Sequence, residues 1–287
     1  MTPSALLPSF AAVRLRARAF VRLLGALGFF ALPIAGTGAE TATSAVLEPA
    51  GVHAIPDLAL TLLWVKPGTF MMGSPPNEPN RNKAEGPQRR VTLTTGFWLG
   101  KTEVTQNQYE AVEGANPSRF TDVGKTAPAE RVSWLDAMAW CKKLTARERA
   151  AGRLPAGYVY TLPTEAQWEY ACRAGTTGDY AGNPDAMAWH DQNSGETTHP
   201  VGLKEPNAWG FHDMSGNVLE WCLDWYGDYP RGAETDPAGP DSGHFRMARG
   251  GSWRMKIEVG RSAARAGGSP ARRDYTLGFR LALTAVK

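Results

Sequence analysis

The segment Asp213-Met-Ser-Gly-Asn-Val-Leu-Glu-Trp221 brings three side-chain oxygen donors, Asp213, Asn217 and Glu220, into one short stretch. Gly216 permits a sharp turn that points backbone carbonyls inward. Calcium binds about six to eight oxygens, commonly a mixture of carboxylates and carbonyls. The same residues also fit an Asx-turn that leads into a strand, with Glu220 paired to an arginine. On the residues alone, the two interpretations are equally good.

The chain around this segment is irregular. From about residue 175 to residue 246 it is rich in Gly, Pro, Asn and Asp and has little periodicity. So much irregular backbone has to be held by aromatic packing or by bound ions. A second oxygen-rich loop lies here, Asp191-Gln-Asn-Ser-Gly-Glu196. It has the residue types of another ion site, although a solvated turn accounts for them better.

Regular elements are predicted on both sides of this region. Three helices begin at capping boxes, in which two side chains satisfy free N–H groups of the first turn: Thr105 with Gln108, Ser133 with Asp136, and Thr164 with Gln167. Short strands are predicted over residues 91–95, 158–162, 247–253 and 278–283. Glu165 and Glu169 lie one turn apart on the third helix, which predicts a solvated or salt-bridged edge.

The composition is that of a globular protein. Of 287 residues, 43% are hydrophobic and 21% charged, and the mean hydropathy is -0.33. These values exclude a disordered chain and a multi-span membrane protein. Lys and Arg number 31 against 28 Asp and Glu, and the resulting net charge of +3 is too small to indicate a nucleic-acid partner.

The first residues predict export. Residues 1–39 have a basic lead, an apolar run over 23–34 and small residues at 37–39, the pattern of a secretory signal peptide. The apolar run is shorter than the about 20 residues of a membrane-spanning helix, so a retained anchor is the lesser alternative. We therefore expect a periplasmic or secreted protein without a membrane span in its mature chain. Residues 40–57 are predicted to be a linker and residues 58–287 one domain.

The sequence lacks the motifs of common enzyme classes. It has no GxSxG, GxxxxGK[ST], GxGxxG or HExxH segment. Its three cysteines, Cys141, Cys172 and Cys222, form no CxxC pair and have no spacing that suits a structural zinc site. Their odd number leaves at least one thiol unpaired within the chain.

A series of short segments runs in order through most of the chain: Gly68-Thr-Phe-Met-Met-Gly73, Glu103-Val-Thr-Gln-Asn-Gln-Tyr109, residues 128–140, Leu162-Pro-Thr-Glu-Ala-Gln-Trp-Glu-Tyr170, Pro206-Asn-Ala-Trp-Gly210, Gly216-Asn-Val-Leu-Glu-Trp221, Arg249-Gly-Gly-Ser-Trp253 and Gly278-Phe-Arg280. This series resembles the formylglycine-generating enzyme, or sulfatase-modifying factor, family over about residues 60–284. Each motif alone is modest, and their common order makes chance implausible.

The resemblance implies an α+β domain with a C-type-lectin-like core, poor in regular structure and stabilised by calcium. It places one calcium site on Asp213, Glu220 and the carbonyls of Gly216 and Val218. The family has asparagine where Asp213 stands, which exchanges one oxygen ligand for another. A second site maps onto Asn193 and the Ser194 carbonyl, with Glu196 as a candidate acid, in a loop that is shorter here than in the family.

The resemblance also implies a lost copper site. The family's enzymes oxidise a sulfatase cysteine to formylglycine with oxygen and copper(I), which two cysteines hold because copper(I) selects thiolates. The corresponding residues 253–261 contain no cysteine, and Met255 is their only sulfur. No copper and no catalytic residue are therefore expected.

Two further family cysteines are replaced, by Ser262 and Leu281, and they would bridge to the positions of Cys141 and Cys172. We thus predict that Cys141 and Cys172 are buried free thiols. Cys222 is the remaining thiol with a chance of reaching the surface.

Three hypotheses follow. The favoured one is a binding or accessory module, without the copper-dependent oxidase activity, that takes a protein or peptide partner. The second is a divergent enzyme of the family, such as one that matures siderophores. The third is sulfatase maturation by other means.

Overall fold

The computed structural model describes residues 51–286, which belong to one folded unit. The predicted signal peptide and residues 40–50 of the predicted linker lie outside the described residues. The rest of that linker is folded, because β1 (Val52–Ile55) pairs antiparallel with β2 (Leu60–Val65). The boundary predicted at residue 58 is therefore too late. β1 is held by contacts with distant residues, such as the 2.7 Å hydrogen bond between His53 and the Tyr160 hydroxyl, which composition does not reveal.

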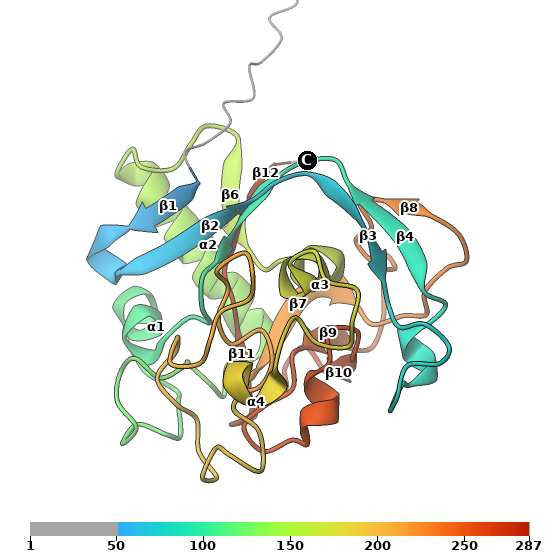
Figure 1. Cartoon of the computed structure of the whole chain (residues 1–287). Coiled ribbons are helices and arrows are strands. Elements are labelled where there is room, and N and C mark those ends of the chain that lie inside the picture. Colours follow the sequence, from blue (N-terminus) through green and yellow to red (C-terminus); the bar gives the residue numbers. More distant parts are fainter. Residues whose placement is uncertain (1–50, 287) are drawn as a thin grey trace, which may run out of the picture. The chain divides into compact units, whose positions relative to one another are not determined.

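Within the described residues, three sheets form the framework (Figure 1). The first is antiparallel and has the order β1, β2, β5 (Phe97–Gly100), β12 (Ala282–Ala285), β6 (Tyr158–Thr161). The second has the order β10 (Ala266–Gly268), β9 (Arg246–Arg249), β7 (Leu219–Trp225), β11 (Leu277–Phe279), with β7 and β11 parallel. The third joins β3 (Gly68–Met72), β4 (Arg89–Leu93) and β8 (Glu234–Thr235).

The three predicted helices are confirmed. They are α1 (Gln106–Glu113), α2 (Trp134–Ala150) and α3 (Glu165–Arg173). Each begins at its predicted capping box, and in α3 the Thr164 hydroxyl accepts the N–H of Gln167 at 3.2 Å. In Figure 1, α3 lies near the centre of the fold, where it contacts β3, β7 and β9, while α2 packs on β6. The remaining helical pieces are short: α4 (Pro184–Met187) and the 3-10 turns Pro56–Leu58, Lys83–Glu85 and Ile257–Gly260.

The predicted strands are correct in place and differ in length. The stretch 247–253 ends as a strand at Arg249, because Gly250 and Gly251 adopt positive φ values of 96° and 72°. The stretch 278–283 is divided between β11 and β12, which belong to different sheets. The chain changes sheets at Arg280, and this change brings the Arg280 guanidinium into the interior.

Aromatic side chains fill the core between the sheets. Trp140, Trp168 and Trp221 are completely buried, and each indole N–H has an acceptor within 3.2 Å. Paired N–H groups remove the penalty for burying a polar atom, so large rings can stabilise a domain with little regular structure. No helix of the described residues is long and apolar enough to cross a membrane.

All three cysteines are free and buried. This agrees with the prediction for Cys141 and Cys172. The expectation that Cys222 reaches the surface is wrong, because β7 is a central strand covered on both sides and Cys222 has no exposed area.

Candidate functional site

The loop 213–220 crosses the centre of the fold and ends in β7. Asp213, Gly216 and Asn217 all have positive φ, between 54° and 80°. At Gly216 a Cβ atom would stand 2.1 Å from the Trp189 carbonyl oxygen, so only glycine fits this turn. The backbone therefore takes the sharp course that the sequence predicted.

Glu220 is fully buried and bound by two partners. Its two oxygens accept hydrogen bonds from the Arg280 guanidinium at 2.7 and 2.9 Å, and the Trp168 indole donates to it at 2.7 Å. Arg280 in turn donates to the carbonyls of Gly100 and His212 at 2.8 Å. This is the arginine pairing that the sequence offered as the alternative to a calcium site.

Three other oxygens of the loop have no hydrogen-bond partner among the described loops and side chains, one on Asp213 and two on the backbone. Asp213 accepts the N–H of Gly202 at 2.7 Å through Oδ2, while its Oδ1 is buried and unpaired among the described residues. No hydrogen bond from the described loops or side chains reaches the carbonyl oxygens of Gly216 and Val218. An unpaired buried oxygen is costly, so these groups fit a cation that binds them.

Glu103 is a third carboxylate at this place, and the sequence analysis did not identify it. It is buried, and neither of its oxygens has a partner within residues 51–286. Burial, followed by the charges of Asp213 and Glu220, raises the pKa of Glu103 well above its usual value. Burial likewise raises the pKa of Asp213 to about 6. The available signal was the position of Glu103 at the head of one of the family-like motifs, just before the cap of α1.

We call Glu103, Asp213, Glu220 and Arg280 the carboxylate cluster. When all three carboxylates are ionised, they exceed the single guanidinium by two negative charges. Among the described residues, no three His, Cys, Asp or Glu side chains are arranged to hold a metal by themselves. Carbonyl oxygens such as those of Gly216 and Val218 would have to complete a calcium shell, as calcium chemistry allows.

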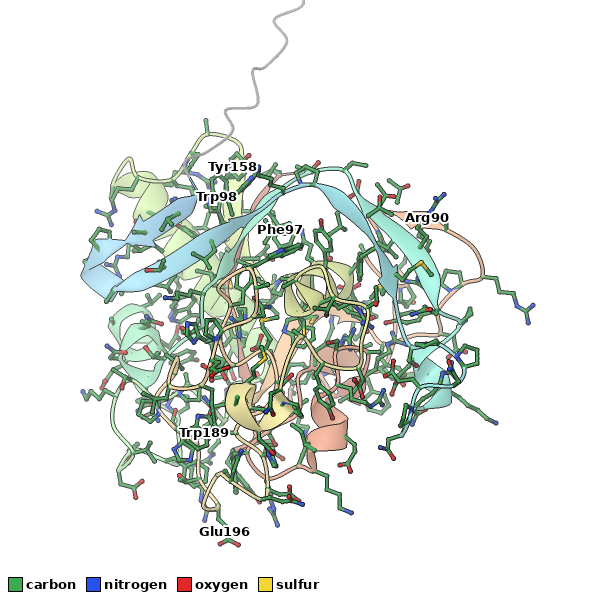
Figure 2. All side chains as sticks on the ribbon, viewed as in Figure 1. Arg90, Phe97, Trp98, Tyr158, Trp189 and Glu196 are labelled. Atoms are coloured by element: carbon green, nitrogen blue, oxygen red, sulfur yellow. The ribbon has the colours of Figure 1, made fainter. Side chains whose placement is uncertain are left out.

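The second predicted calcium site looks different. The Asn193 side-chain oxygen accepts the N–H of His190 at 2.9 Å, and the Ser194 carbonyl accepts from His199 at 2.7 Å. Glu196 is exposed, and Figure 2 shows it at the edge of the fold, pointing away from it. These contacts are those of a hydrogen-bonded turn. The second calcium site stays a prediction, and no buried unpaired side-chain oxygen among these three residues supports it.

The Glu165 and Glu169 pair proved to be interior. Glu169 is fully buried and paired with Arg249 and, at 2.8 Å, with Arg173. Glu165 is bound by Arg265 at 2.7 Å. Burial would raise the pKa of Glu165, but Arg265 and Arg249 outweigh it and hold the pKa below its usual value. The predicted salt bridges exist, but not at a solvated edge, because the arginines lie 80 or more positions after the glutamates they pair with, or in the helix's own last turn.

A cleft of about 480 Å³ lies between the loops that follow α1, α4 and β9 and the segment just before β11. Its lining residues are Arg119, Phe120, Asp191, Ser194, Glu196, Trp253, Arg254 and Tyr275. The three aromatic rings contact one another with centroids 5.2 to 6.3 Å apart. The Arg119 guanidinium lies 5.1 Å from the Tyr275 ring centre. The sequence singled out Trp253 and Glu196 within motifs and did not predict that these loops share a cleft.

Comparison with known proteins identifies the family. The model of the sulfatase-modifying factor enzyme 1-like domain matches residues 51–285, and the chain belongs to this family. The predicted α+β, C-type-lectin-like fold is confirmed with it.

Individual relatives differ in kind. The chain is 32% identical to the chaperone protein LppX of Paenibacillus barcinonensis, over 62% of this chain and 76% of the relative. It is 29% identical to the formylglycine-generating enzyme of Mus musculus, over 78% and 76% of the two chains. Among solved structures, Treponema denticola variable protein 1 is 30% identical with a TM-score of 0.71, covering 80% of this chain and 97% of that one. PvdO from Pseudomonas aeruginosa is 25% identical with a TM-score of 0.71, covering 82% and 98%.

Proposed function

We propose that this protein is an exported, calcium-stabilised binding or accessory module of its family, without the copper-dependent cysteine oxidase activity. The observation that carries the proposal is the chemistry beside the cleft. Trp253 and Arg254 line the cleft, and they begin the stretch in which the resembling enzymes hold their cysteine pair. Here residues 253–261 contain no cysteine, and the thioether of Met255 is a weak neutral donor for copper(I).

The three existing thiols support the same conclusion. Each is buried, and burial raises the pKa of Cys172 to about 11 and that of Cys222 well above its ordinary value. The thiolate is the form that binds metals and attacks substrates. Thiols held neutral in the core do not provide the reactive pair that formylglycine formation requires.

The cleft suits a peptide or a protein segment. Phe120, Trp253 and Tyr275 offer aromatic area for an apolar side chain. Arg254 and Arg119 supply positive charge, and Glu196 with Asp191 supplies negative charge. A cleft lined by aromatic rings and by side chains of both charges suits a peptide segment with polar groups better than it suits an apolar small molecule.

Calcium and export complete the proposal. The unpaired oxygens of Glu103 and Asp213 support calcium at the carboxylate cluster. The proposal of export rests on the signal-peptide pattern of residues 1–39. To test cleavage near residue 39, the intact mass of the protein is measured in the exported fraction. The full-length mass in that fraction would contradict it.

A peptide-display selection tests the binding function. Wild-type protein is expected to enrich peptides that the Trp253→Ala variant does not retain, because the Trp253 ring lines the cleft. Arg90→Glu is the matched control for surface charge, since Arg90 is exposed on β4 and lies far from Glu196 in Figure 2. Equal retention by wild type and Trp253→Ala would contradict a binding role for the cleft.

The alternative is a divergent enzyme of the family, and the similarity to formylglycine-generating enzymes favours it. It is tested by incubating the protein with a cysteine-bearing sulfatase peptide, oxygen, copper and a thiol reductant. Mass spectrometry of the peptide then reports any aldehyde. Conversion to the aldehyde would establish the alternative and overturn the non-catalytic proposal.

A further inference from the structure

Glu130 holds one wall of the cleft from the interior. Its side chain is completely buried. Its Oε1 accepts the N–H of Phe120 at 2.9 Å and also the N–H of Arg119, and its own N–H donates to the Ser118 hydroxyl at 3.2 Å. These three hydrogen bonds attach the segment 118–120 to Glu130. Because Arg119 and Phe120 line the cleft, the position of this wall depends on Glu130.

The hydrogen-bonding of Glu130 is asymmetric. Two successive N–H groups converge on Oε1, an arrangement that favours an anion. The other oxygen, Oε2, is buried and has no partner in the part of the chain that the structure describes. A buried, unpaired carboxylate oxygen is costly while it carries charge, and a proton on Oε2 removes that cost. The geometry therefore permits a neutral form that keeps Oε1 in place.

The groups around Glu130 do not hold its carboxyl group in a single protonation state. Burial raises the pKa of Glu130 to about 7, against the opposing effect of the Phe120 and Arg119 N–H groups. The guanidinium groups of Arg131 and Arg119 act in the same opposing direction. The neighbouring loop carries Asp274, whose carbonyl accepts the N–H of Arg131 at 2.9 Å. The Asp274 carboxylate is itself bound by Arg272 at 2.9 Å and by the hydroxyl and N–H of Thr276.

We propose that Glu130 is a positioning residue whose protonation state controls how strongly the cleft binds its ligand. The ionised carboxylate fixes the wall formed by Arg119 and Phe120, and protonation loosens this wall and weakens binding. Hydrogen bonds to a charged acceptor are about twice as strong as those to a neutral one, so the neutral acid keeps the contact and loses part of its strength. The coupling to binding rests on the proposed function of the cleft.

Stability and binding should respond to pH in opposite directions. A carboxyl group whose pKa is raised in the folded state favours folding when it is protonated. Its contribution to stability is therefore largest at acidic pH and declines as the pH rises toward about 7. Binding, in contrast, should strengthen over the same rise, as the wall becomes fixed. A residue with a purely structural role would move both quantities together.

The wall can be observed without a ligand. Amide proton resonances of Arg119 and Phe120 are followed by NMR between about pH 5 and about pH 9 in wild type and in Glu130→Gln, which keeps the shape and cannot titrate. Both resonances are expected to move with a midpoint near 7 in wild type and to stay fixed in the variant. Glu110→Gln, on the exposed side of α1, is the control and should titrate like wild type. Resonances that do not move, or that move equally in Glu130→Gln, overturn the role of Glu130.

Coupling to binding is measured with the peptides selected by the wild-type cleft. Their affinity should fall on acidification in wild type and stay constant in Glu130→Gln. If the wall titrates but the affinity does not change, the coupling is wrong and the binding function stands. If no peptide is selected, the proposed function fails and the coupling fails with it, whereas the NMR titration still decides whether Glu130 positions the wall.

Discussion

Removal of calcium is expected to lower the melting temperature of the domain, and Glu103→Gln is expected to reduce that loss. The reason is the carboxylate cluster. Glu103, Asp213 and Glu220 are all buried, and Arg280 is the guanidinium paired with this group. A divalent cation would cancel the remaining two negative charges and would give the unpaired oxygens of Glu103 and Asp213 a partner.

The size of the effect follows from linkage. A ligand that binds only the folded state adds about 2.7 kcal/mol at a hundredfold excess over its Kd. For a domain of this size, 1 kcal/mol corresponds to about 2–4 °C, so chelation should lower the melting temperature by about 5–10 °C. Glu103→Gln removes one carboxylate that calcium could bind and no hydrogen bond of the described chain. The raised pKa of Glu103 lets it take up a proton when calcium is absent, so the variant should melt close to wild type in EDTA and should gain less stability from calcium than wild type does.

Differential scanning calorimetry with added calcium or with EDTA measures both effects, and elemental analysis measures bound calcium. Glu110→Gln is the matched control, because it removes the same charge from an exposed position on α1. Glu220→Gln is less informative, since it leaves Arg280 buried and unpaired and should cost about 3–5 kcal/mol in either state. The reasoning is refuted if EDTA leaves the melting temperature unchanged and no calcium is found, or if Glu103→Gln loses as much stability on calcium removal as wild type does.

Three further predictions concern sulfur chemistry and the buried ion pairs. Stoichiometric copper(I) binding should be absent, and a copper titration in anaerobic buffer that saturates at one equivalent would contradict this. Arg249→Ala should cost about 3–5 kcal/mol in urea denaturation, because it removes one of the two guanidinium groups that pair with the buried Glu169, whereas Lys143→Ala at an exposed pair should cost about 1 kcal/mol or less; equal losses would contradict the argument. Ser262→Cys should form a disulfide with Cys172 on mild oxidation and raise the melting temperature; a titration in denaturant that finds four free thiols, and not the two of Cys141 and Cys222, would show that it does not form.

The elements that could be predicted from the sequence are those that short-range chemistry determines. The caps at Thr105, Ser133 and Thr164 each involve residues three positions apart, so the sequence displays them directly. The turn at Gly216 was predictable for the same reason, because its glycine and oxygen donors are neighbours in the chain. The family-like motifs extended this knowledge to the fold, since their order reflects the same packed core.

The contacts that decide the site were hidden by distance along the chain. Glu103 gave no local signal of a ligand, because its neighbours in the cluster lie about a hundred or more residues later. Glu165 was predicted to lie at a solvated or salt-bridged edge, because its partner Arg265 lies far along the chain and the sequence does not show the contact. Glu130 had no visible role, since its function depends on the backbone of Phe120 and not on any side chain that a motif would display.

The residues at the positions of the two missing family disulfides show how the fold can persist without them. The Cys172 Sγ atom lies 3.7 Å from the Ser262 hydroxyl, and Cys141 and Leu281 belong to the same core cluster. Cys172 and Ser262 are therefore still adjacent, and Cys141 and Leu281 still share one core, although no disulfide joins either pair. A disulfide acts mainly by restricting the unfolded chain, so its loss leaves the native contacts in place and lowers stability instead. Stability must then come from the packed tryptophans, the buried ion pairs and, as proposed, calcium. For the same reason, the retained fold is no argument for retained catalysis, because the scaffold and the reactive thiols can be lost independently.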